Sequence, residues 1–236
     1  MGKRELLLYS QQRIEDKTNE ITAIPLIPDP LDVSDAVVSI DAIGTQTKIA
    51  SQIRKQKGHY FLSVKGDQNN LLEDIEYAFM SNAGLDNFEE LNYGHGRIET
   101  RKCSILLALD YLQGENYQAW KDISMLVRIE SSRDVCGVIT QETRYYISDE
   151  TIRSASYYNS LARGHWGIEN NLHWHLDVTF GEDRCRARNG YAPENLATIR
   201  KLALQIISNA NDKLSLKKRQ YKAALDEEYI KKLIAF

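Results

Sequence analysis

Short apolar runs alternate with amphipathic segments in the first third of the chain. Residues 36–41 (Ala-Val-Val-Ser-Ile-Asp) and 59–64 (His-Tyr-Phe-Leu-Ser-Val) are mostly apolar, as expected of buried strands. In residues 45–57 and 69–81 the apolar positions recur at helical spacing instead. Strand, helix, strand and helix in this order predict a parallel βαβ unit with a right-handed crossover.

Two further elements are expected upstream of this unit. Residues 4–14 contain the run Leu6-Leu7-Leu8-Tyr9 and are interpreted as a strand. Residues 20–31 favour a short helix, whose length is limited by Pro25, Pro28 and Pro30.

The pattern changes after Gly84, where helix signals become rare. Residues 99–109, 125–130 and 135–147 are rich in Ile, Val, Thr and Tyr, which predicts antiparallel strands. Turns are expected at residues 113–116 and 131–134, because Gly, Asn, Asp and Ser gather there.

Helices are predicted for the rest of the chain. Ser148-Asp149 resembles a helix start, and helical spacing covers residues 152–178, 193–210 and, more weakly, 216–232. Pro193 suits the first position of its helix, where its missing N–H has no partner to lose.

The first of these helices contains the most unusual stretch of the chain, residues 163–177. In a regular helix His165, Glu169 and His173 stand at i, i+4 and i+8 and share one face. A carboxylate among imidazoles and indoles is not ordinary surface, so we expect a functional site there. The His-Glu-His pattern would also suit zinc, but carboxylates favour Mg²⁺ and no third zinc ligand is evident.

The charge is distributed unevenly along the chain. The net charge is −3, yet residues 184–236 hold twelve Lys and Arg against five Asp and Glu, a net of +7. An acidic body with a basic tail suggests nucleic-acid binding, although a solvated helix would explain the tail equally well. Three widely spaced cysteines, no signal-peptide pattern and no membrane-length apolar run predict a cytoplasmic protein without membrane contact.

Several polar residues stand where ligands are expected. Asp41 ends the strand 36–41, and the carboxyl ends of parallel strands are where α/β sheets place ligands; its alternative role is to cap the next helix. Lys65 ends the next strand and could contact a phosphate or be a simple strand-end cation. His95 and Arg97 lie in a loop beside glycines, where such residues serve binding more often than packing. The alternating Arg184, Arg186 and Arg188, in an expected extended segment, could follow phosphates or be solvated on a strand edge.

Five motifs occur in an order that resembles a known family. They are Lys17-Thr18-Asn19-Glu20-Ile21, Ile40-Asp41-Ala42-Ile43-Gly44-Thr45-Gln46, Lys65-Gly66-Asp67-Gln68, His95-Gly96-Arg97 and His165-Trp166-Gly167-Ile168-Glu169-Asn170 with Leu172-His173-Trp174. Together, over about residues 15–210, they resemble the H-repeat-associated insertion-sequence transposases of bacteria. These belong to the DDE transposases, which have a ribonuclease-H-like core.

The resemblance implies an Asp-Asp-Glu triad that binds two Mg²⁺ or Mn²⁺ ions. Asp41 is similar to the second Asp and Glu169 to the Glu of this triad. The first Asp, expected in an Asp-Gly-Lys context on an earlier strand, has no counterpart before Lys17, and Asp67 stands where Asn is expected. The resemblance therefore implies a chain truncated at its N-terminus and inactive alone.

The expected architecture is α/β. A ribonuclease-H-like catalytic domain would cover residues 1–183, with an antiparallel β insertion at about 90–147, and a basic helical segment would cover 184–236. The expected partners are double-stranded DNA and a second copy of the chain in a homodimer. The residues expected to contact DNA are Lys65, His95, Arg97, Arg163, His165, Trp166, Arg184, Arg186 and Arg188.

Three other functions remain open from the sequence. The chain could be a catalytically dead remnant that still binds DNA, which the missing Asp favours. It could be a metal-dependent nuclease unconnected with transposition. It could also be an α/β interaction protein in which the His- and Trp-rich helix is only core.

Overall fold

The computed structural model describes residues 31–234, except 83, 95, 153 and 169–171. The strand expected at residues 4–14 and nearly all of the helix expected at 20–31 lie outside this part. The chain divides into two compact units, one that ends at His165 and one that continues from Trp166 towards the C-terminus. The predicted domain boundary after residue 183 stays a prediction.

A mixed sheet forms the first unit, with the strand order β1-β2-β6-β5-β4-β3. Its strands are β1 (Val37–Ile40), β2 (His59–Val64), β3 (Asp86–Gly94), β4 (Arg97–Leu107), β5 (Met125–Val135) and β6 (Val138–Ser148). β1 and β2 are parallel, as predicted, with Val37 opposite His59. All other pairs of neighbouring strands are antiparallel, which confirms the antiparallel strands predicted after Gly84. Because β2 also pairs with β6, the insertion continues the sheet rather than forming a separate one.

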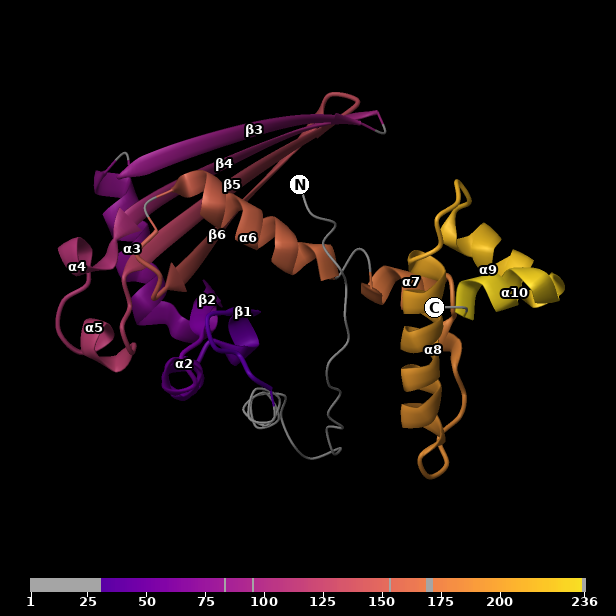
Figure 1. Cartoon of the computed structure of the whole chain (residues 1–236). Helices are drawn as coiled ribbons and strands as arrows, with labels where there is room; N and C mark the ends of the chain where they lie inside the picture. Colours follow the sequence, from indigo (N-terminus) through magenta and orange to yellow (C-terminus); the bar gives the residue numbers. More distant parts are fainter. Residues whose placement is uncertain (1–30, 83, 95, 153, 169–171, 235–236) are drawn as a thin grey trace. The chain divides into compact units, whose positions relative to one another are not determined.

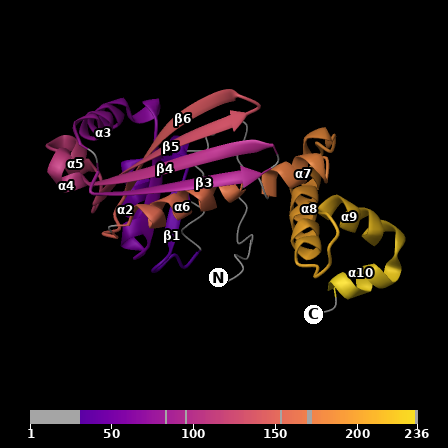
Figure 2. The same cartoon turned by 90° about the horizontal axis from the view of Figure 1, so that it is seen from above.

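Helices cover both faces of the sheet near β1 and β2 (Figures 1 and 2). On one face, α2 (Thr47–Lys55) and α3 (Asn69–Ser81) contribute Ile49, Ile53 and Ile75 to an apolar core. The short helices α4 (Ala108–Tyr111) and α5 (Glu115–Ala119) follow β4. On the other face, α6 (Ala155–Ile168) packs Tyr158 and Ala162 against the strands. The farther ends of β3–β6 extend beyond these cores and are largely exposed, with polar residues and exposed apolar ones such as Val138 and Ile139.

Two features of the insertion differ from the sequence prediction. The turn expected at residues 131–134 is wrong, because those residues pair along their whole length with β4 and β6. The chain turns instead at Cys136 and Gly137, which both have positive φ (53° and 84°), the geometry of a two-residue hairpin turn that matches the strand twist. β3 was not predicted; none of its residues is buried, so its sequence lacks a hydrophobic signal.

The second unit is helical, with α7 (Trp174–Val178), α8 (Ala192–Ser208), α9 (Leu216–Leu225) and α10 (Glu227–Ile234). The helix predicted over residues 152–178 is present as α6 and α7, with π-helical turns at Leu172 and His173. The helix predicted over 216–232 is two helices, because the backbone of Asp226 is extended. Among the helices that the structure describes, none is long and apolar enough to cross a membrane.

An arginine ties the C-terminal helices together. Arg219 is 9% exposed and donates to the Asp212 carboxylate at 2.8 Å and to the Ile207 carbonyl at 2.8 Å. The Tyr229 hydroxyl donates to the other Asp212 oxygen at 2.6 Å. Arg219 is one of the twelve basic residues of residues 184–236, but its charge is paired with Asp212 inside the unit and does not face solvent.

Candidate catalytic site

Asp41 and Lys65 directly follow the two parallel strands, β1 and β2. Because parallel strands end at the same edge of a sheet, both side chains lie at that edge. The Lys65 ammonium stands 3.3 Å from Asp41 Oδ1, and each side chain is 51% exposed. Both residues were predicted as ligand contacts from their positions after the strands, and the structure brings them together.

The local backbone orients the Asp41 carboxylate. A short 3₁₀ helix, Ala42–Gly44, follows β1, and the Ala42 N–H donates to Asp41 Oδ1 at 2.7 Å. Partial burial raises the pKa of Asp41, but this hydrogen bond and the positive charge of Lys65 outweigh it. The pKa therefore lies below its ordinary value, and Asp41 is an ionised, accessible carboxylate at neutral pH. Asp41 also caps this 3₁₀ helix, so the capping role considered from the sequence is present, although the cap of α2 itself is Gln46. Capping uses one carboxylate oxygen, and the ligand-binding role of Asp41 stays a prediction.

Two residues that were not predicted as site residues, Thr45 and Gln68, hold this loop in place. Thr45 is fully buried and donates from its hydroxyl to the Ser63 carbonyl of β2 at 2.6 Å. The Gln68 side-chain amide, from the loop after Lys65, donates to the Thr45 carbonyl at 3.0 Å. The segments that carry Asp41 and Lys65 are therefore cross-linked. Both residues belong to the motifs quoted above, which was the signal available for finding them.

His165 joins the site from α6. Its Nδ1 lies 3.1 Å from the hydroxyl of Ser39, two residues before Asp41 on β1. The charged form of His165 contributes to the lowered pKa of Asp41, after burial, the Ala42 hydrogen bond and Lys65. Asp41, Lys65 and His165 thus come together from three separate segments.

The remaining predicted site residues stand in other situations. Glu169 and His95 lie outside the described residues, so the helix face shared by His165, Glu169 and His173 stays a prediction. Trp166 begins the second unit. Arg97 and Arg163 form ion pairs with Glu99 and Glu90, respectively, on the β insertion.

The three alternating arginines lie in the second unit. Arg184 ends a 3₁₀ helix, Glu182–Arg184, whereas Arg186 and Arg188 follow in an irregular segment. All three are exposed, and the residues between them are half-buried. The expected extended conformation does not hold for Arg184, which belongs to the 3₁₀ helix. Arg188 also donates to the Cys185 carbonyl at 2.8 Å, which limits its reach.

The described residues offer one carboxylate at this site. Within residues 31–234, apart from the gaps stated above, no three His, Cys, Asp or Glu side chains gather into a metal-binding group. The donor itself fits a hard cation, because Asp41 is ionised and half exposed. A second carboxylate would have to come from Glu169 or from another part of the protein.

Comparison with known proteins places the chain in a family. Residues 2–206 match the family model described as "Transposase DDE domain". The chain is 34% identical over 238 residues to the "H repeat-associated putative transposase YhhI" of Escherichia coli (strain K12), covering 97% of this chain and 62% of that protein. It is 34% identical over 236 residues to the "Putative transposase YncI" of Escherichia coli O157:H7, covering 97% of this chain and 60% of that protein.

The fold and the site define a mixed α/β protein with an ionised aspartate at the carboxyl edge of parallel strands. The chain belongs to the transposase DDE domain family. It spans about 60% of the length of these relatives.

Proposed function

We propose that this chain is part of the catalytic region of a DDE transposase that binds double-stranded DNA and cleaves and joins its strands with Mg²⁺ or Mn²⁺. The carrying observation is that Asp41, the residue similar to the second Asp of the triad, is an ionised carboxylate beside Lys65 and His165. Membership of the family and the basic C-terminal segment support the same function.

Each residue of the site has a role in this proposal. Asp41 and Glu169 would hold the metal ions, which when bound activate the attacking oxygen and stabilise the leaving oxygen at phosphorus. Lys65 would offset the negative charge of the scissile phosphate, since its ammonium already stands at the strand edge beside Asp41. His165 would orient the end of β1 through Ser39.

The proposed core is ribonuclease-H-like, and β1 would be an interior strand of it. In the described part of the chain β1 pairs only with β2, and its residues Val, Val, Ser and Ile are all half-buried. Five of the six residues of β2 are buried, although its composition is similar. An apolar strand with an open edge supports a further neighbouring strand, which we expect to carry the first Asp.

Without that Asp, residues 1–236 alone are expected to bind DNA but not to cleave it. Three converging carboxylates are needed to hold two ions, and loss of one member of such a unit removes most of the activity. The protein would act in the cytoplasm, and as a homodimer where two DNA ends are joined. A DNA-binding remnant is the second candidate function, because the described residues provide a single carboxylate, Asp41, at the candidate site.

The test is an end-cleavage assay on DNA that carries the element's own termini, with Mg²⁺ or Mn²⁺. We expect no cleavage by residues 1–236 and cleavage by a longer reading frame that restores an upstream Asp. In the longer protein Asp41→Asn and Glu169→Gln should abolish cleavage, whereas Asp67→Asn, a matched change close to Lys65, should not. Failure of the longer protein to cleave would favour the remnant.

Metal-dependent cleavage by residues 1–236 that is lost on Asp41→Asn would show that the chain supplies the missing carboxylate itself. Cleavage of any DNA without preference for the element's termini would instead favour a nuclease unconnected with transposition.

A further inference from the structure

The β insertion has a cationic face on the side of the sheet that α6 covers. Side chains alternate between the faces of a strand, so Arg101 of β4 shares the face of Cys103, which packs in the core under α6. Arg101 lies opposite Glu90 of β3 and Ser131 of β5. The same face carries the arginines Arg97, Arg133 and Arg144, and α6 adds Arg163; we call these five residues the arginine face.

Four members of the arginine face are paired with carboxylates. Arg97 and Arg133 lie 2.8 and 3.5 Å from Glu99. Arg144 donates two hydrogen bonds to Glu142, at 2.6 and 2.7 Å. Arg163 pairs with Glu90.

Arg101 is the exception. Within the described part of the chain it has neither an ion pair nor a hydrogen bond from its guanidinium, although it is half-buried. Burial lowers its pKa, and the charge of Arg163 lowers it further, while the charges of Glu90 and Glu99 oppose this. An arginine stays protonated under such conditions, so within the described residues this cation has no ion-pair partner of its own.

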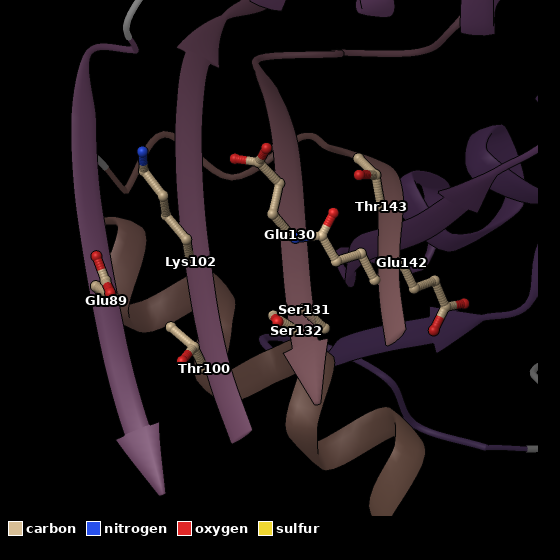
Figure 3. Close-up of a pocket in the computed structure, with 9 residues that line it drawn as sticks. Glu89, Thr100, Lys102, Glu130, Ser131, Ser132, Glu142 and Thr143 are labelled. Atoms are coloured by element: carbon tan, nitrogen blue, oxygen red, sulfur yellow. The ribbon is translucent and has the colours of Figure 1, made fainter. Parts of the chain in front are cut away.

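The opposite face of the same strands is different in character. Figure 3 shows Lys102, the next residue along β4, between Glu89 of β3 and Glu130 of β5. The hollow around them is lined by hydroxyl groups of Thr100, Ser132 and Thr143. The nearby Arg128 is engaged by Glu130 at 3.3 Å and lies over the Phe79 ring at 4.9 Å. Carboxylates outnumber available cations there, so an anion fits the arginine face and not this one.

We propose that the arginine face binds the phosphate backbone of duplex DNA and that Arg101 contacts a phosphate directly. The inference rests on the proposed function, because it assumes that the chain binds DNA, and it adds a second contact surface, separate from Arg184, Arg186 and Arg188. A guanidinium presents a planar set of donors that matches phosphate oxygens. Arg97 and Arg101 are four residues apart on β4, about 13 Å at the strand rise, so the face extends over several phosphates of one DNA strand.

Arg101 and Lys102 form a natural pair for the test. Each change to Ala removes one positive charge from adjacent positions of one strand, but on opposite faces of the sheet. We would measure binding of residues 1–236 to a short fluorescent duplex by anisotropy over a series of salt concentrations. For Arg101→Ala the slope of log affinity against log salt should fall by about 0.9, and affinity at about 0.1 M salt should weaken roughly eightfold. Lys102→Ala should resemble the unaltered protein, and Arg101→Lys should retain most of the slope.

The outcomes separate this inference from the proposed function. If the unaltered protein binds the duplex and Arg101→Ala leaves the slope unchanged, the inference is wrong and the proposed function stands. If Arg101→Ala and Lys102→Ala weaken binding equally, the effect is one of net charge and the inference is again wrong. If the unaltered protein does not bind duplex DNA, both are wrong.

Two further measurements guard against a structural explanation. Thermal unfolding of each variant shows whether the fold is retained. If Arg101→Ala proves unstable, Arg101→Lys, which keeps the charge, is compared with the unaltered protein in the same salt series. Light scattering without DNA tests the other occupant of this face, a second copy of the chain. A change in mass on Arg101→Ala with no change in slope would assign the face to protein contact and overturn the proposal.

Discussion

Among the charged residues of the first unit, Asp149 is the one whose substitution is expected to lower stability most. It directly follows β6, its side chain is fully buried, and it joins β6 to the start of β2. One carboxylate oxygen accepts from the Tyr60 N–H at 2.6 Å. The other lies 2.7 Å from His59 Nδ1 and 2.9 Å from the Arg54 guanidinium. Because β2 carries Lys65 at its other end, this link also supports the candidate site.

The cost of Asp149→Ala follows from these contacts. The buried Tyr60 N–H would lose its partner, which costs about 1–3 kcal/mol, and a charge-assisted hydrogen bond with Arg54 contributes about 1.5–3 kcal/mol more. Arg54 is only 24% exposed, but it keeps its contact with Asp122 at 3.1 Å, so part of its charge stays compensated. We therefore expect Asp149→Ala to lower the free energy of unfolding by about 3–5 kcal/mol, as is typical when one partner of a buried ion pair is removed.

Urea unfolding followed by tryptophan fluorescence measures this loss, because Trp120 is buried in the same unit. The melting temperature should fall by roughly 6–20 °C. Asp149→Asn, which can still accept from Tyr60, should cost less than Asp149→Ala. Asp122→Asn is the matched control, since it removes the exposed charge beside the same arginine, and Asn tolerates the positive φ of 59° at this position; it should cost below about 1 kcal/mol. Equal losses for Asp149→Ala and Asp122→Asn would refute the assignment of Asp149 as the buried anchor.

Two further predictions concern the second unit. Replacing Arg184, Arg186 and Arg188 together by Ala should flatten the salt dependence of DNA binding by up to about 3 units without lowering the melting temperature, and an unchanged slope would remove them from the DNA contact. The Tyr229 hydroxyl, the Leu214 N–H and Arg219 lower the pKa of Asp212 from 3.8 to about 2. Its contribution to stability is therefore complete above the unfolded value and is lost as the pH falls from about 4 to about 2. Thermal melts in this range should show a smaller acid-induced loss for Asp212→Asn than for the unaltered chain, and identical losses would contradict the link.

Periodicity along the chain was sufficient to predict the unit β1-α2-β2-α3. Each helix of this unit buries one face, and each strand buries one or both faces. These patterns of apolar positions span only a few turns of helix or a few strand residues, so they are a local property of the sequence. The parallel pairing of β1 and β2 followed, and with it the position of Asp41 and Lys65 at one edge. The sequence also determined the family, because five separate motifs agree.

Other features depend on contacts between distant segments, which local patterns do not contain. β3 has no buried residue and exists because β4 pairs with it, and the polar half of β5 is a strand because it has a neighbour on each side. Ser148-Asp149 resembled a helix start, but the Asp149 carboxylate is taken by β2, and α6 begins only at Ala155. The contact of His165 with Ser39, 126 positions apart, could not be read from either segment.

The contrast between Arg101 and Lys102 illustrates the same limit. The sequence determined that these neighbours in a strand point to opposite faces, since alternation is a property of the extended backbone. Only the tertiary structure decided which face lies beside α6 and which carboxylates reach each cation. Charge pairing acts over a few ångströms in space, so it is set by the packing of the sheet and not by the order of residues along the chain.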